Sequence, residues 1–252
     1  MVAQSPELTE VGGAALRDPA WVSARIAEMG RSWGTDSCRA AGTLWWCMVA
    51  SALVRPVIGA YAAQAAVPVV ELDRITCPVR ADGGVETVRL AEPAGPGAAR
   101  GPAAHRDGET GPEAAGSGAE TPAAADAAGA SRAAAPSGRA AAQALRASLA
   151  SAIATVAQAS GAGIPALWAV VADAIGNRAI DAGAPAAAGV LARDVGGKLP
   201  APRFQEVAGR TFVKRISCCL VFEAPGCDMC TSCPKRPAAE RERLLTALTT
   251  GN

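Results

Sequence analysis

The chain has 252 residues, half of them hydrophobic, and its 24 basic residues nearly balance 23 acidic ones. A net charge of +1 predicts no general attraction to nucleic acid or to anionic membranes, so we expect neither as a partner. With only three Phe, one Tyr and five Trp, the core must depend on aliphatic side chains and tryptophan.

The N-terminal part, residues 1–90, contains two predicted helices. Asp18-Pro19 is typical of a helix start, and the apolar residues that follow recur at helical spacing. A second, strongly apolar helix follows a cap at Asp36 or Ser37, and we expect Pro56 to kink or end it.

Two further features precede the second half of the chain. Residues 76–90 predict a β-hairpin about the turn Asp82-Gly83-Gly84. Residues 91–138 are rich in Gly, Pro, Ala and Ser and contain no aromatic residue, so we expect a flexible insertion. The only histidine, His105, falls in this insertion, which favours a solvated loop residue over a catalytic one.

Helical periodicity returns in residues 139–210. One helix is predicted from Arg139 to the breaker at Gly161, and another begins near Pro165, a residue favoured in the first helical turn. A third candidate covers 186–193, and a final amphipathic helix is expected at 238–248. The sequence therefore predicts an α+β fold that is predominantly helical, with a small β-hairpin and a C-terminal cysteine-rich cluster-binding segment.

The sequence gives little indication of a targeting or membrane-spanning segment. The N-terminus, residues 1–10, has neither a basic nor an apolar region, which argues against a secretory signal. The longest uncharged apolar stretch, 40–54, is shorter than the ~20 residues that a spanning helix needs. We therefore expect no transmembrane segment and a cytoplasmic location.

The last part, residues 211–252, contains five of the eight cysteines. In a reducing compartment such clustering indicates metal or redox ligands rather than disulfides. The five are an adjacent pair followed by three at two-residue intervals: Cys218, Cys219, Cys227, Cys230 and Cys233.

The adjacent pair separates this pattern from common zinc knuckles. Neighbouring side chains of a strand point to opposite faces, so Cys218 and Cys219 can ligate one centre only if the backbone there is irregular. Pro225-Gly226 can reverse the chain so that the second half of the motif returns to the first. Ligand chemistry alone leaves zinc and an iron–sulfur cluster both open.

The segment 218–233, Cys-Cys-x10-Cys-x2-Cys, resembles the C-terminal motif of the FhuF-like ferric-siderophore reductase family. The flanking words Arg215-Ile-Ser-Cys-Cys-Leu and Cys-x-x-Cys-Pro agree with it. Upstream, Leu167-Trp168 with Gly176-Asn177-Arg178 resembles a helix of this family, although Trp168 itself is expected to fill the core.

The resemblance implies a [2Fe–2S] cluster held by Cys218, Cys219, Cys230 and Cys233, with no catalytic residue beyond the cluster. Cys227 departs from the pattern and stays open as a substitute ligand. The implied activity is reduction of an Fe(III)–siderophore to release Fe(II), with electrons from an external donor such as a ferredoxin, a flavoprotein or a small reductant.

Two non-reductase alternatives remain open: a four-cysteine module that binds zinc or a cluster without enzymatic activity, and a siderophore-binding domain with a structural cluster. Three cations before the motif, Arg210, Lys214 and Arg215, are candidates for steering an anionic substrate or an acidic donor. Outside the motif, Cys38, Cys47 and Cys77 are expected to be buried small hydrophobes.

Overall fold

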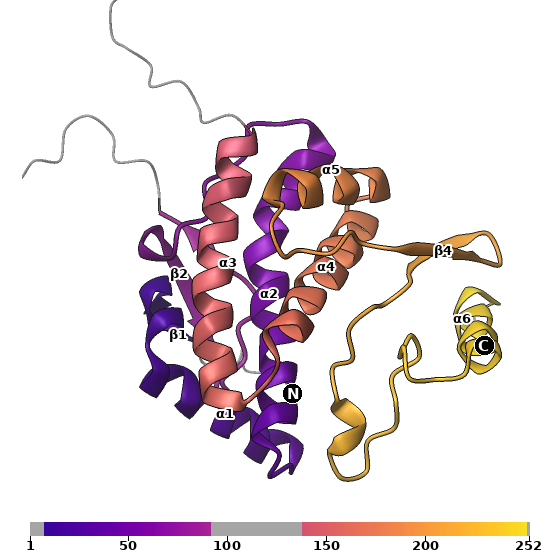
Figure 1. Cartoon of the computed structure of the whole chain (residues 1–252), viewed down its shortest axis with the longest axis horizontal. Coiled ribbons are helices and arrows are strands. Elements are labelled where there is room, and N and C mark those ends of the chain that lie inside the picture. Colours follow the sequence, from indigo (N-terminus) through magenta and orange to yellow (C-terminus); the bar gives the residue numbers. More distant parts are fainter. Residues whose placement is uncertain (1–7, 92–137, 251–252) are drawn as a thin grey trace, which may run out of the picture. The chain divides into compact units, whose positions relative to one another are not determined.

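The computed structural model describes residues 8–91 and 138–250. The expected insertion at 91–138, with His105, therefore lies outside the described residues except for its two end positions. All the described residues belong to a single unit of the chain. In it five helices carry most of the core, and they are followed by a short hairpin, the cysteine segment and a last helix (Figure 1).

The helices of the core are α1 (Pro19–Trp33), α2 (Cys38–Ala63), α3 (Gly138–Ser160), α4 (Ile164–Asp181) and α5 (Pro185–Val195). The predicted helices are confirmed, with α5 slightly longer than expected. Asp18 caps α1 by accepting from the backbone N–H of Ala20, and Ser37 rather than Asp36 caps α2. Gly34 ends α1 in the left-handed conformation that favours glycine.

Helix α2 is the centre of the fold and packs against α1, α3, α4 and α5 (Figure 1). Its two tryptophans are fully buried, and both indole N–H groups find acceptors. Trp45 donates to the carbonyl of Gly83 at 2.8 Å and Trp46 to that of Leu167 at 2.9 Å. These bonds connect α2 to the hairpin turn on one side and to α4 on the other.

Of the two effects expected of Pro56, a kink or an end of α2, the end is wrong. The helix continues to Ala63 with Pro56 inside it. Because Val54, Val57 and Ile58 are all buried around this proline, packing of the apolar side chains outweighs the one backbone hydrogen bond that proline removes.

The predicted hairpin is confirmed as part of a larger sheet. Strands β2 (Ile75–Val79) and β3 (Arg89–Leu90) are antiparallel, and β1 (Thr9–Gly12), which the sequence analysis missed, adds to the other edge of β2. Gly83 has a positive φ of 79°, and the Gly84 N–H donates to Asp82 Oδ1. The positive φ at glycine and the hydrogen bond from the backbone to the aspartate are the features expected of an Asp-Gly-Gly turn.

A second, two-stranded hairpin leads to the cysteines. Strands β4 (Phe204–Val207) and β5 (Arg210–Val213) are joined by Ala208 and Gly209, which both have positive φ. This matches the two-residue turn whose twist suits a hairpin. Three short 3-10 turns, η1 (Gly13–Arg17), η2 (Leu72–Arg74) and η3 (Val221–Glu223), and the last helix α6 (Ala238–Thr250) complete the described elements.

Helices α2 and α3 are long and apolar enough to cross a membrane by length and composition alone. Much of each lies against the rest of the protein: 44% and 50% of their most apolar windows are buried. The core helix of a globular domain has the same properties, so this resemblance is weak evidence for a membrane span.

Candidate iron–sulfur centre

The cysteine segment between β5 and α6 has an irregular backbone, as the adjacent pair requires. Cys218 and Cys219 lie outside any strand, and Leu220 has a positive φ of 61°. After η3 the chain turns at Pro225-Gly226, where Gly226 has a φ of 73°, and the second half of the motif returns toward the first.

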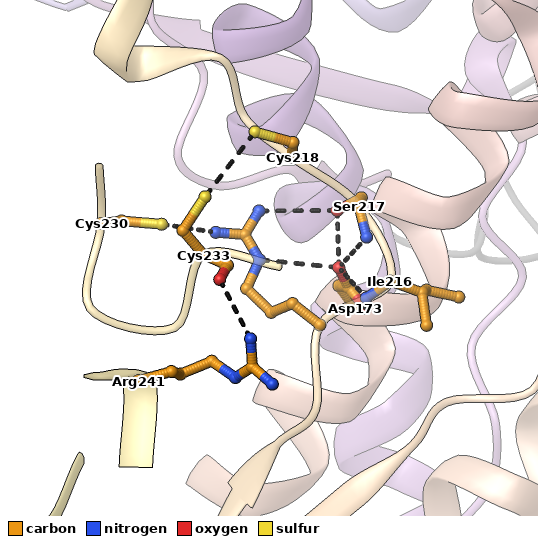
Figure 2. Close-up of polar contacts among 8 residues, drawn as sticks. Asp173, Ile216, Ser217, Cys218, Cys230, Cys233 and Arg241 are labelled. Carbon is orange, nitrogen blue, oxygen red and sulfur yellow. Dashed lines mark hydrogen bonds and ion pairs between the residues drawn. The ribbon is translucent and has the colours of Figure 1, made fainter. Parts of the chain in front are cut away.

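The motif cysteines meet as two pairs. The Sγ atoms of Cys218 and Cys233 are 3.9 Å apart (Figure 2), and the side chains of Cys219 and Cys230 lie close enough to shift each other's pKa. Two thiolates on one tetrahedral iron or zinc, with metal–sulfur bonds near 2.3 Å, lie about 3.8 Å apart. The first pair therefore already has the separation of two ligands on one metal.

The four cysteines of the motif supply the donor set that a [2Fe–2S] cluster needs, two thiolates for each of two irons. Cys218, Cys219, Cys230 and Cys233 are the residues that would hold it. Within residues 8–91 and 138–250, no three His, Cys, Asp or Glu side chains form a ready-made site for a metal ion.

Cys227 is the fifth cysteine of the segment. Its backbone N–H donates to the carbonyl of Ala224, and its side chain is half-buried. That it is a free thiol beside the site rather than a substitute ligand stays a prediction.

The guanidinium of Arg215 places a positive charge beside the cysteine sulfurs. Its Nη1 lies 3.4 Å from the Sγ of Cys230, and its Nη2 lies 3.5 Å from the Ser217 hydroxyl (Figure 2). The guanidinium is largely buried, with 15% of the side chain exposed. A cation in this position offsets the negative charge that thiolates bring to the site.

Asp173, on α4, holds this arrangement in place and was missed by the sequence analysis. Its buried carboxylate accepts from the backbone N–H groups of Ile216 and Ser217 and from the Ser217 hydroxyl, and it pairs with Arg215 Nε at 3.5 Å. A lone aspartate on an apolar helix carries no local signal of such a role. The partners are 42 to 44 residues later, and only the fold brings them together.

The second half of the motif, which contains Cys230 and Cys233, is also fixed by cationic side chains. Arg236 Nε donates to the Cys230 carbonyl at 3.0 Å and its Nη2 donates to that of Met229, while Arg241 Nη1 lies 3.4 Å from the Cys233 carbonyl. These bonds satisfy carbonyls that the turn leaves without partners. The first half is tied to α2, because Arg39 pairs with Glu223 of η3 at 3.2 Å.

The thiols differ in proton affinity when no metal is bound. The hydrogen bond with Cys230, with help from the Val221 N–H and Arg215, lowers the pKa of Cys219 to about 5 despite burial. The same hydrogen bond raises the pKa of Cys230. Such a pair shares one proton, so one of the two sulfurs is a thiolate near neutral pH.

The other predicted residues have mixed outcomes. Of the three candidate steering cations, Arg215 lies among the cysteines, whereas Lys214 is exposed and Arg210 stacks over the Phe212 ring at 5.4 Å. Cys77 is buried as expected, but Cys38 is exposed, which corrects that prediction: it is the first residue of α2 and precedes its buried part. Cys47 is half-buried, and burial raises the pKa of its thiol to about 12.

Residues 215–235 match the family model of the FhuF 2Fe-2S C-terminal domain. The resemblance of the cysteine segment to this family is confirmed. The match covers the whole motif, from Arg215 to the residue after Cys233-Pro234, and it implies a [2Fe–2S] cluster as the cofactor. Comparison with curated proteins and with solved structures gave no significant match.

Trp168, in the upstream stretch that carried the looser resemblance, is 4% exposed and fills the core as predicted. Asn177 and Arg178 of the same helix are accessible and border the cysteine site. The relation to an iron–sulfur, siderophore-iron reductase-like family therefore depends on the cysteine segment.

Proposed function

We propose that this protein reduces Fe(III) held by a siderophore and so releases Fe(II) in the cytoplasm. The observation that carries the proposal is the two-by-two pairing of Cys218 with Cys233 and of Cys219 with Cys230, in a segment that matches a 2Fe-2S domain of siderophore-iron reductases. These four cysteines are the residues that would hold the cluster.

When bound, a [2Fe–2S] cluster supplies one-electron redox chemistry. Overall, one electron from an external donor converts Fe(III) to Fe(II), and the siderophore is left chemically unchanged. Siderophores bind iron through hard anionic oxygens, which hold Fe(III) far better than Fe(II), so reduction makes the iron exchangeable. The donor is expected to be a ferredoxin, a flavoprotein or a small reductant.

The residues around the cysteines need to hold the cysteines in place and to balance their charge. They need not move protons. Asp173 fixes the backbone of the adjacent cysteine pair, and Arg215 keeps a positive charge at Cys230. Electron delivery to a metal requires no general acid or base.

Single-turnover reduction tests the proposal. The anaerobically purified protein is reduced chemically, freed of reductant and mixed with a ferric siderophore, while the return of the oxidised-state absorption and the Fe(II) trapped by a chromogenic chelator are followed. The proposal predicts one Fe(II) for each chain oxidised. A protein whose spectrum does not change on mixing, at any chelate concentration, has a structural cluster and contradicts it.

A further inference from the structure

A cavity of about 230 Å³ opens beside the cysteine site. It lies between α2 and α4, and its wall includes one of the motif cysteines. The residues that matter here are Cys47, Ser51, Asn177, Arg178, Arg215 and Cys219. A molecule held in this cavity lies next to Cys219, which is part of the wall.

Two neighbouring hollows continue this cavity along the same two helices. One, of about 370 Å³, shares Cys47, Ser51 and Arg178 with the first cavity. The other, of about 290 Å³, shares Arg178 with both and Arg55 with the second. Arg178 borders all three hollows, which are here named together the α2–α4 groove; the hollow of about 370 Å³ is in the size range of small-molecule sites.

The α2–α4 groove contains positive charge that the protein leaves available. Arg55 is exposed and forms no ion pair with any described residue. Arg178 pairs with Asp181 at 3.2 Å, but Asp181 is 57% exposed and such pairs contribute little, and the buried Arg178 Nε has no acceptor in the described chain.

The acidic groups of the groove are already engaged. Asp173 is occupied by Arg215 and by the backbone at Ser217, and Glu86 pairs with Arg80. Asp181 is the third carboxylate of the groove, and its pair with Arg178 is the exposed one described above. The two arginines can therefore bind an anion without breaking a buried interaction.

We propose that the α2–α4 groove is the substrate site and that it binds an anionic ferric chelate, one whose iron is held by carboxylate or catecholate oxygens. Arg55 and Arg178 contact the anionic oxygens, and the chelate extends toward Cys219. The inference rests on the proposed function for its substrate, but the groove, its charge and its position beside the cysteine are independent of it.

Binding of a redox-inert analogue tests the groove without any electron transfer. The cluster-loaded, oxidised full chain is titrated by calorimetry with a gallium(III) tris(catecholate) complex, which is a trianion, and with a neutral gallium(III) tris(hydroxamate) complex. We expect the trianion to bind more tightly, and less tightly as salt is raised. Equal affinity for the two complexes would overturn the charge assignment.

Three variants locate the site. Arg178→Gln and Arg55→Gln are each expected to weaken trianion binding about tenfold or more, since each removes a charge-assisted contact. Arg193→Gln, an exposed arginine of α5 outside the groove, is the matched control and should bind like the wild type. If Arg178→Gln does not fold, the exposed Arg55→Gln carries the test alone. If the groove variants bind the trianion as tightly as the wild type does, the groove is not the substrate site.

The two proposals fail in different ways. If the groove variants lose binding but the reduced wild-type protein never reduces the iron(III) tris(catecholate), the groove is an anion site and the proposed function is wrong. If the wild-type protein reduces this complex and the groove variants bind and reduce it equally well, the proposed reductase function is supported and the assignment of the groove as the substrate site is wrong.

Discussion

The carboxylate of Asp173 accepts hydrogen bonds from both the backbone N–H and the hydroxyl of Ser217, at 2.9 and 2.5 Å. This contact joins a buried residue of α4 to the residue directly before the adjacent cysteine pair. The main helical core therefore determines where Cys218 and Cys219 lie, although the motif itself is in irregular chain.

Replacing Asp173 by asparagine should loosen the cysteine site. The variant keeps the volume but loses the charge that balances Arg215, and leaving a buried guanidinium unpaired costs about 3 kcal/mol in the free energy of unfolding. We expect a lower melting temperature and less iron and sulfide per chain. Asp181→Asn, which changes an exposed carboxylate of the same helix, is the control and should differ from wild type by less than about 0.5 kcal/mol.

Serine replacements test which sulfurs hold the cluster. Cys219→Ser and Cys230→Ser each remove one member of a pair and should abolish the visible absorption of the anaerobically purified protein. Cys227→Ser should largely preserve it, because Cys227 falls outside the Cys-Cys-x10-Cys-x2-Cys pattern of the motif. An unchanged spectrum in either of the first two variants, or loss of colour in the third, would refute the ligand assignment.

Arg215→Gln should lower the midpoint potential of the centre. Reduction adds a negative charge beside Cys230, and a guanidinium 3.4 Å from its Sγ stabilises that charge, so removing the cation favours the oxidised state. The expected shift is on the order of tens of millivolts, measured by an EPR-monitored redox titration. Arg215→Lys, which keeps the charge, should shift it less, and Arg210→Gln should leave it unchanged. A rise in potential on loss of the charge would contradict this role.

Deleting residues 100–135 is expected to leave fold and centre intact. The segment contains no aromatic residue and few branched aliphatic ones, so it can bury little apolar surface. The shortened chain should keep the melting temperature, far-UV circular dichroism and visible spectrum of the full one. Loss of soluble protein would show that the segment contributes to the fold.

The sequence predicted those features that depend on local chemistry. Periodicity located the core helices, and the Asp-Gly-Gly turn located β2 and β3. The cysteine segment resembled the FhuF 2Fe-2S C-terminal domain, whose family model matches residues 215–235 and implies the cofactor. The irregular backbone at the adjacent pair followed from the alternation of side chains in a strand, and Leu220 confirms it.

Features that depend on distant partners were not predictable from local patterns. Asp173 acts on residues 42 to 44 positions away, and β1 is too short to be recognised without β2 beside it. Pro56 stays inside α2 because the surrounding side chains are buried, a property of packing that the sequence does not display. The groove along Arg55 and Arg178 likewise exists only because α2 and α4 lie side by side.

EPR of the dithionite-reduced, anaerobically purified protein, with iron and acid-labile sulfide analysis of the same sample, tests the central claim most directly. The pairing of Cys218 with Cys233 and of Cys219 with Cys230 predicts a reddish-brown protein with about two iron and two sulfide atoms per chain, and a reduced-state EPR signal of one unpaired spin. A colourless protein that contains zinc, no sulfide and no EPR signal would contradict it.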